Sequence, residues 1–294
     1  MMNDNLYIFL HIPRTGGTFI EHCFGSFYDR TNERYLKHYS YTSELSEFYL
    51  FHHRIPLLSH RTKEQQNKLK IITGHSTHCR SDLWVRTKRK KKIFAVIRNP
   101  IDRLLSSFNH KHELTVLKQD KSCFTSSYPT ANKHSTSHQK TAEDYDTLYE
   151  YYCDVNSDQN LQTKWLLKSF TYYSNDKFYD LKDYYDNVDL SETDLSNQTW
   201  PTWFCYKEFD DYFELLKPYL SQLWKLYNFD DLEDEMEKLS KIMDTEWLPD
   251  SPKNESGTLV PKYWTLEDVM NQPDIELLIE SEKYDFRLYD LVSS

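Results

Sequence analysis

A loop between two apolar segments near the N-terminus carries residues that could bind a phosphate. It reads His11-Ile12-Pro13-Arg14-Thr15-Gly16-Gly17-Thr18. The two glycines let the main chain approach an anion closely, and a helix beginning there would direct free N–H groups and its positive dipole end at the ligand. Arg14 adds a charge, and Thr15 and Thr18 add hydroxyl donors. The pattern is not a Walker A loop, because no Lys follows the glycines; the alternative is an ordinary strand–helix turn.

A second candidate anion site follows the apolar segment 93–97. Arg98 comes directly after this segment, and Arg is suited to bidentate binding of phosphate. Asn99 and Pro100 are good residues for the N-cap and the first position of a helix. Ser106 lies about two turns into that helix. The alternative is that Arg98 makes a structural ion pair and Ser106 only packs.

The elements that must position these residues alternate between strands and helices. Hydrophobic patterning predicts buried strands over 6–10, 70–73 and 93–97. It predicts helices over 18–27, with a capping box at Thr18–Glu21, from Pro100 to about His112, and over 160–170, 209–227, 231–243 and 274–292. The segment 172–199 is predicted to be irregular. This rhythm indicates an α/β fold with a central, mainly parallel sheet flanked by helices, in which ligands bind at the carboxyl ends of the strands.

The two anion-binding segments together resemble the nucleotide site of the PAPS-dependent sulfotransferase family. HIPRTGGT follows a strand, and RNPIDRLLSSF comes about eighty residues later. In that family the first loop holds the 5′-phosphosulfate, and an Arg and a Ser with the spacing of Arg98 and Ser106 hold the 3′-phosphate. The resemblance implies a P-loop-like three-layer fold, PAPS as donor, PAP as product and no metal. It implies a donor site formed by Arg14, Thr15, Gly16, Gly17, Thr18, Phe19, Arg98 and Ser106.

Softer motifs resemble the carbohydrate branch of that family, the heparan and chondroitin type known as sulfotransferase family 2, as a soluble microbial or viral relative. Asn160–Lys164 is similar to that branch's N-x-Q-T-R motif, and Asn254–Ser256 with Asp285–Tyr289 is similar to its C-terminal ending. The resemblance implies a saccharide acceptor. The chain departs from the family at Arg14, where a Lys is usual, so a planar fork replaces a compact ammonium.

His75 is the predicted general base among twelve histidines. It follows the strand predicted at 70–73, so it would lie at the same sheet edge as the phosphate loop, and His suits proton transfer near neutral pH. His78 is the reserve candidate, as base or as acceptor contact, and His11 is expected to pack or hydrogen-bond near the nucleotide. A metal site of His75, His78 and Cys79 has no partner pair at suitable spacing.

Composition limits the partners of the protein. With 294 residues and 38% hydrophobic content, the chain can bury a core, and we expect one domain over 1–294 with a flexible insertion around 118–141. A net charge of -10 argues against general nucleic-acid binding. Without a signal peptide or a run approaching ~20 apolar residues, we expect a cytoplasmic protein with no membrane partner. Five widely spaced cysteines without CxxC fit reduced thiols.

The sequence therefore predicts a sulfotransferase that moves a sulfuryl group from PAPS to a hydroxyl, with His75 and Arg14 as the catalytic residues. One alternative is a P-loop-like nucleotide kinase or hydrolase, which would require a loop Lys and a metal-binding acid at a strand end. The other is a nucleotide-binding protein without catalysis.

Overall fold

The computed structural model describes most of the elements on which these predictions depend. It describes residues 5–23, 35–37, 70–73, 77–81, 88–118, 140–154, 159–174, 177–187, 211–243 and 260–293. Residues 119–139, which contain nearly all of the predicted insertion, lie outside the described part of the chain. The single domain and the insertion stay predictions.

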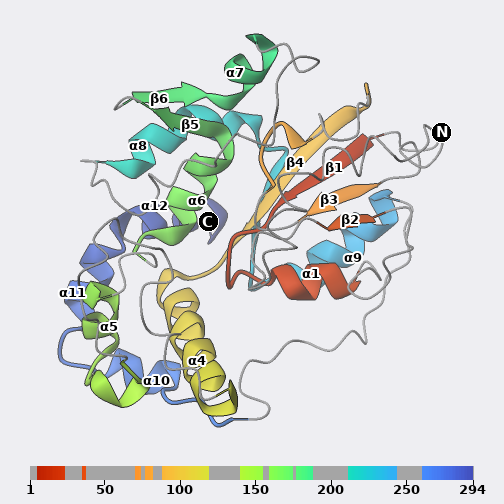
Figure 1. The fold of residues 1–294 in the computed structure, drawn as a ribbon. Helices are drawn as coiled ribbons and strands as arrows, with labels where there is room; N and C mark the ends of the chain where they lie inside the picture. Colours follow the sequence, from red (N-terminus) through yellow and green to blue (C-terminus); the bar gives the residue numbers. More distant parts are fainter. Residues whose placement is uncertain are drawn as a thin grey trace.

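The core of the fold is a parallel sheet (Figure 1). Its strands, in spatial order, are β2 (Tyr35–Lys37), β3 (Ile71–Thr73), β1 (Asn5–Leu10), β4 (Lys90–Ile97) and β7 (Lys225–Asn228). All neighbouring pairs are parallel, with Ile8 of β1 opposite Ile72 of β3 and Ile93 of β4. The segments that enter both candidate anion sites therefore leave neighbouring strands at the same edge.

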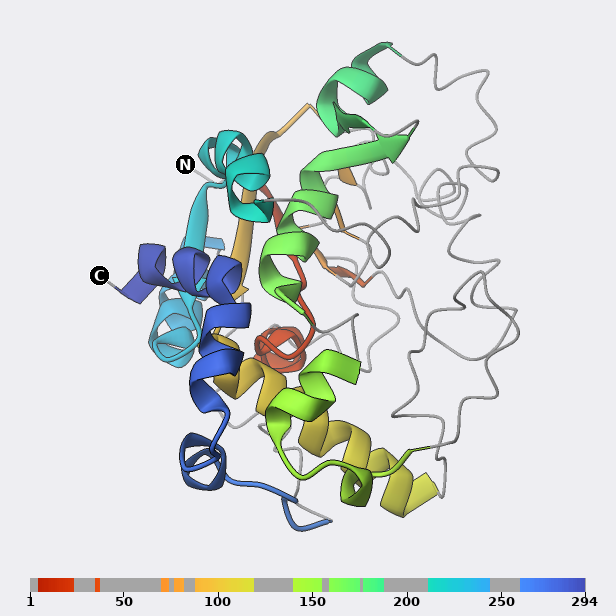
Figure 2. The ribbon, with the colours of Figure 1, turned by 90° about the vertical axis from the view of Figure 1, so that its left-hand side faces the viewer.

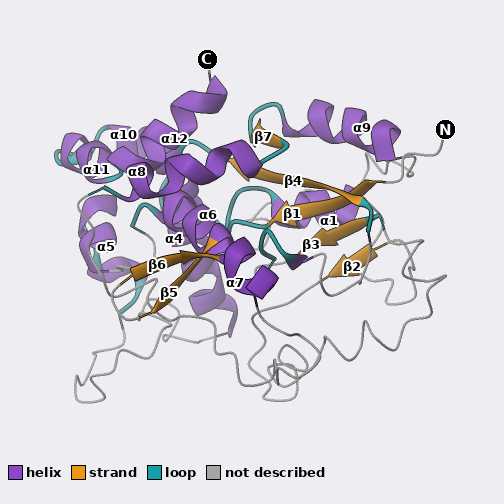
Figure 3. Cartoon of the chain, turned by 90° about the horizontal axis from the view of Figure 1, so that it is seen from above, coloured by secondary structure: helices purple, strands orange, loops and turns teal. Residues whose placement is uncertain are grey.

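Alternating side chains of the strands form a core on each face of the sheet, as the period of two requires. One core joins Ile8, Leu10 and Ile97 to α6 (Leu161–Phe170), α8 (Tyr212–Leu216) and α12 (Lys283–Ser293). The other joins alternate residues of the same strands to α1 (Gly17–Cys23) and α9 (Leu232–Met243). Figure 3 shows the sheet between the two groups of helices. The predicted P-loop-like, three-layer α/β fold is confirmed.

A third apolar cluster lies beyond the end of the sheet and carries one wall of the candidate site. It contains α4 (Pro100–Lys118), α5 (Leu148–Asp154) and α11 (Ile275–Ser281), with the 3-10 helix η3 (Ala142–Asp144) and α10 (Leu266–Met270) nearby. Figure 2 shows α4, α5 and α11 grouped together at the bottom of the view, in yellow, light green and blue. The ring of Phe108 in α4 stacks on Trp264 with centroids 4.5 Å apart, which ties the C-terminal segment to α4.

The predicted helix over 209–227 is wrong in its second half. Asp211 caps α8 by accepting hydrogen bonds from the N–H groups of Phe213 and Glu214. The chain continues as the 3-10 helix η7 (Lys217–Gln222), which contains Pro218, and then as strand β7. The apolar side chains up to Leu223 have helical spacing and predict a longer helix, but residues 225–228 pair with β4 instead.

Three other local predictions need correction. The segment expected to be irregular begins with a hairpin, β5 (Thr171–Ser174) and β6 (Lys177–Asp180), followed by α7 (Leu181–Asn187). The helix predicted over 274–292 is two helices, α11 and α12, separated at Glu282. The capping box at Thr18 is wrong because α1 begins at Gly17, and the N–H of Ile20 bonds to the carbonyl of Gly16.

None of the helices described here is long and apolar enough to cross a membrane. The cytoplasmic location stays a prediction.

Candidate functional site

The loop between β1 and α1 has the tight backbone that an anion cradle requires. Gly16 has a φ of 85° and Arg14 a φ of 68°, both in the left-handed region, which is strained for Arg and costs Gly nothing. At Gly17, a Cβ would lie 1.7 Å from Nε2 of His11. Glycine at 17 therefore makes room for the imidazole, while glycine at 16 makes the turn.

The loop is also closed from the other side by the segment that follows β7. A Cβ on Gly16 would lie 2.5 Å from Cδ2 of Leu232 and 2.9 Å from Cε2 of Phe229. Thr15 is fully buried, and its hydroxyl donates to the carbonyl of Ile12 over 2.9 Å. The Thr15 side chain therefore stabilises the turn and is not among the residues that line the cavity, whereas Thr18 and Phe19 do line it.

Arg98 follows β4 as predicted, and the described residues offer its side-chain donors few hydrogen-bond acceptors. Its guanidinium stacks over Phe229 at 4.5 Å, and its Nη1 lies 3.5 Å from the carbonyl oxygen of Arg14. Its buried Nε has no hydrogen-bond partner among the described residues. Burial lowers the pKa of the Arg98 guanidinium, against an opposing effect of Asp102. A partly buried cation with an unused donor is well suited to an incoming anion.

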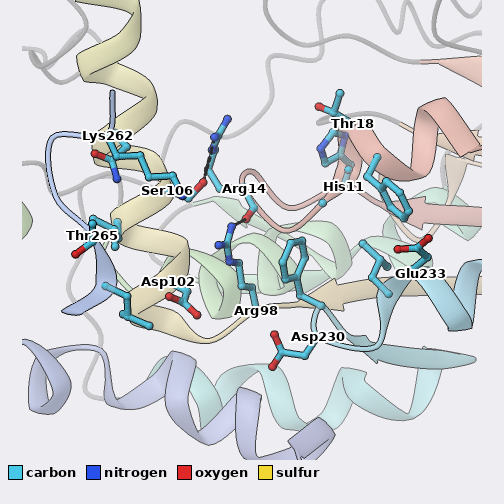
Figure 4. A pocket seen from close by; sticks show the side chains of 18 of the residues that line it. His11, Arg14, Thr18, Arg98, Asp102, Ser106, Asp230, Glu233, Lys262 and Thr265 are labelled. Carbon is cyan, nitrogen blue, oxygen red and sulfur yellow. Dashed lines mark hydrogen bonds between the residues drawn. The ribbon is translucent and has the colours of Figure 1, made fainter. Parts of the chain in front are cut away.

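Ser106 joins the two candidate sites. Nε and Nη2 of Arg14 donate to its hydroxyl over 3.2 and 3.1 Å, across 92 positions of sequence. Figure 4 shows the Arg14 side chain directed at Ser106, with Arg98 next to Arg14. The predicted residues Arg14, Arg98 and Ser106 are thus brought together. Asn99 caps α4 as expected, since its Oδ1 accepts from the N–H groups of Ile101 and Asp102.

These residues line one cavity of about 700 Å³. Its lining includes Gly16 and Gly17. In the view of Figure 4, His11 and Thr18 lie on one side of the cavity and Ser106 on the other. A volume of this size is within the range of small-molecule and nucleotide sites.

The C-terminal segment forms a cavity wall that the sequence did not predict. Lys262, Trp264 and Thr265 line the cavity, and Figure 4 shows Lys262 and Thr265 on the Ser106 side. Asn109 of α4 holds this segment: its Oδ1 accepts from the N–H groups of Tyr263 and Trp264, and its Nδ2 donates to the carbonyl of Trp264 over 2.9 Å. No local motif marks Lys262. The only available signal was a cation beside two aromatic residues between two predicted helices.

Three carboxylates also line the cavity and moderate its positive charge. They belong to Asp102, Asp230 and Glu233. Burial raises the pKa of Asp102, while Arg98 and Lys262 lower it and Asp230 raises it. Because three cations and three acids line one cavity, we expect the ionisation of Asp102 to influence the affinity for an anionic ligand.

Of the three histidines predicted to lie near the site, the structure describes His78 and His11, and only His11 lines the cavity. His75 lies outside the described residues, so its role stays a prediction. His78 is buried, is not among the residues lining the cavity, and accepts a hydrogen bond at Nδ1 from the N–H of Arg80. Burial, with Arg80 and Lys91, lowers its pKa to about 3. His11 stacks on Phe9 and contributes to the cavity wall.

Metal binding finds no support in the described part of the chain, where no three His, Cys, Asp or Glu side chains are grouped to hold an ion. Cys79 is buried. The expectation of a metal-free reaction stays a prediction.

A parallel α/β sheet whose strand ends present a glycine loop, an arginine with an unused donor and a serine is typical of the class of phosphate- and nucleotide-binding proteins. Comparison with protein families narrows this class. Residues 7–161, slightly more than half of the chain, match the sulfotransferase domain. The chain belongs to this sulfotransferase family, and sulfuryl transfer is the chemistry that membership indicates. No match was found among curated proteins.

Proposed function

We propose that the protein transfers a sulfuryl group from PAPS to a hydroxyl of a saccharide. Family membership supports the sulfuryl transfer, and the cavity supports the choice of donor. The observation that carries the proposal is the Arg14–Ser106 hydrogen bond, because it brings the phosphate loop and the Arg98 segment to one cavity. A nucleotide with phosphates at both its 5′ and 3′ positions is the ligand that would use both.

The residues present fit such a donor. The loop main chain at Gly16 and Gly17, with Thr18, would bind the 5′-phosphosulfate. Arg98, whose buried Nε has no partner among the described residues, and Ser106 would bind the 3′-phosphate. Lys262, which lines the cavity on the Ser106 side, adds a second cation there.

In the proposed reaction, His75 removes the proton of the acceptor hydroxyl. The acceptor oxygen forms a bond to sulfur as the bond between sulfur and the 5′-phosphate oxygen breaks, and PAP leaves. Arg14 would stabilise the charge that develops on the leaving phosphate. As a planar fork it presents several donors where the family's usual Lys presents a point charge.

Calorimetry tests the donor. We expect PAP to bind more tightly than 5′-AMP, which lacks the 3′-phosphate, and more tightly than ATP. Tighter binding of ATP would overturn the proposal in favour of a kinase or hydrolase. An assay with radiolabelled PAPS and panels of oligosaccharides, peptides and small alcohols then tests the acceptor, and transfer only to peptides or alcohols would contradict the saccharide.

The His75→Ala variant tests the base. We expect unchanged PAP binding and a turnover reduced by about 10²- to 10⁴-fold. His78→Asn is the matched control, because His78 is buried away from the cavity. Unchanged turnover in His75→Ala would exclude this base, and His11, the only imidazole among the described residues lining the cavity, would be tested next.

A further inference from the structure

The main chain of Arg98 is held by a side chain from a distant helix. Gln162, in the first turn of α6, is fully buried. Its Oε1 accepts from the N–H of Arg98 over 2.9 Å, and its Nε2 donates to the carbonyl of Arg98 over 2.9 Å. Two opposed bonds from one planar amide fix both the position and the orientation of the arginine main chain, as a neighbouring strand would.

Gln162 is in turn fixed by helix α12. The two oxygens of Asp285, also fully buried, accept from the N–H groups of Gln162 and Thr163 over 2.9 and 2.8 Å. These N–H groups belong to the first turn of α6, which lacks partners within the helix. Asp285 therefore caps α6 from outside, where a carboxylate also complements the helix dipole.

The capping is reciprocal. Asn160, at the N-cap position of α6 with a φ of 44°, does not bond to its own helix through its side chain. Its Oδ1 accepts instead from the N–H groups of Tyr284 and Asp285, over 3.0 and 3.3 Å, at the start of α12. Figure 1 shows α6 and α12 side by side at the edge of the sheet. The starts of α6 and α12 therefore hold one another, and Gln162 projects from this rigid junction to Arg98.

The guanidinium of Arg98 has little else to fix it. It contacts the Phe229 ring and the carbonyl of Arg14, and its Nε is without a partner among the described residues. The place where it meets an anion therefore depends on where its main chain is held.

We propose that Gln162 is a positioning residue, which directs the Arg98 guanidinium toward the 3′-phosphate by clamping the Arg98 main chain, with Asp285 anchoring the clamp. This inference rests on the proposed function, in which Arg98 binds that phosphate. A role confined to core stability would weaken all ligands alike. If Gln162 positions Arg98, its loss weakens the binding only of ligands that carry the 3′-phosphate bound by Arg98.

The test is the ratio of PAP affinity to 5′-AMP affinity, measured by calorimetry on the full chain. Gln162→Met keeps the side-chain length and removes both bonds, and we expect the ratio to fall by about 10-fold. Thr171→Val is the matched control, because it removes a buried hydrogen bond from Thr171 to Leu167 at the other end of α6. We expect the control to keep the wild-type ratio.

Gln162→Glu provides a second, independent readout. An ionised Glu still accepts from the Arg98 N–H but repels its carbonyl, whereas a protonated Glu can also donate and rebuild both bonds. We expect the ratio in this variant to recover toward that of the wild type as the pH is lowered. This measurement stands even if Gln162→Met does not fold.

The two proposals fail in different ways. If the wild type does not prefer PAP to 5′-AMP, or if Arg98→Met keeps the preference, the donor proposal is wrong and the inference falls with it. If Arg98→Met abolishes the preference but Gln162→Met and Gln162→Glu retain it at all pH values, Gln162 is structural only and the inference alone is overturned.

Discussion

The two regions of the cavity that are proposed to bind anions are built in contrasting ways. The phosphate loop owes its internal contacts to its own residues, since Thr15 bonds to Ile12 and His11 lies against Gly17, although the segment after β7 also packs on Gly16. The Arg98 region is shaped by partners far away in the sequence, since Gln162 lies 64 positions from Arg98 and Asn109 lies 155 positions from Trp264. In both of these, a side-chain amide takes the place of a neighbouring strand or turn.

The contrast has a physical origin. A loop that must present several main-chain N–H groups needs special backbone angles, which only nearby residues can impose. A charged side chain at the end of a strand needs only one well-held anchor, which any element packed nearby can supply. Changes in the loop should therefore damage the site directly, whereas changes in the clamps should act through the residues that they hold.

The largest effect is expected from Gly17→Ala. The new methyl group would overlap the His11 ring, displacing the imidazole or the first turn of α1, and overpacking of this kind costs about 1–3 kcal/mol of stability. Because the loop N–H groups would move with the turn, we expect PAP affinity to fall by about 100-fold. Calorimetry measures the affinity, and chemical denaturation the stability.

The double variant His11→Ala/Gly17→Ala sharpens this experiment. Gly17→Ala should cost less PAP affinity when it is made in the His11→Ala variant than when it is made in the wild type, because the ring that the methyl group overlaps is then absent. Additive losses would mean that the ring does not define the loop, and that the contrast with the Arg98 region is overstated.

Arg98→Met should follow in size. It removes a partly buried cation and its unused donor, so we expect PAP affinity to fall by roughly 30- to 100-fold. The affinity for 5′-AMP should change much less, because this ligand lacks the 3′-phosphate. Equal losses for both nucleotides would indicate that Arg98 binds the 5′ group, and that the two regions are one site.

Asn109→Leu tests the second amide clamp. Losing its three bonds to residues 263 and 264 would leave buried main-chain groups unpaired, at a cost of about 1–3 kcal/mol of stability. We expect PAP affinity to fall by about 3- to 10-fold, because Lys262 is carried by the loosened segment. Wild-type affinity with the expected loss of stability would show that the wall does not contribute to binding.

Asp102→Asn should strengthen binding slightly. Burial raises the pKa of Asp102, so its protonated form persists to higher pH than usual. As the pH rises through that pKa, the carboxyl group loses its proton and the cavity gains one negative charge. The variant lacks this charge, and we expect PAP to bind about 2- to 5-fold more tightly at neutral pH, with the advantage disappearing at low pH. Affinity titrations of both proteins against pH measure this, and an advantage that grows toward low pH would contradict it.

The smallest effect on binding is expected from His78→Asn, which lies outside both regions. The pKa of His78 is about 3 in the folded protein, below the ~6.5 of an unfolded chain. The unfolded state therefore takes up a proton as the pH falls below about 6.5, and the free energy of unfolding falls by up to about 1.4 kcal/mol per pH unit. Asn retains an acceptor for the Arg80 N–H without titrating, so denaturation curves should show a weaker acid dependence and unchanged PAP affinity.

Short patterns in the sequence were sufficient for the parts of the protein that local chemistry controls. The apolar runs predicted β1, β3 and the buried part of β4, and Asn99 with Pro100 marked the start of α4. The glycine pair marked the tight loop after β1, and Arg98 was placed correctly after the end of β4. Each of these depends on residues within a few positions of one another, whose conformational preferences are expressed in almost any context.

Local patterns failed where pairing or packing with distant segments decides the structure. An apolar stripe that ends at Leu223 predicts a helix over 209–227, yet residues 225–228 form β7 and complete the sheet beside β4. The hairpin of β5 and β6 lies in a segment whose many Tyr and Asp residues predict irregular structure. Short strands gain their stability from their neighbours, so their own sequences carry a weak signal.

What the sequence determined by itself is the chemistry available at the strand ends: a glycine loop, Arg14, Arg98 and Ser106 on an α/β frame. What only the tertiary structure decided is how these groups are held. Gln162 and Asp285 lie in segments that resemble family motifs, and Asn109 lies in none, but the sequence gives no partner for any of them. A buried amide or carboxylate can satisfy any donor or acceptor that the fold brings within reach. Gln162 can bond to Arg98 only after α6, α12 and the end of β4 have packed together.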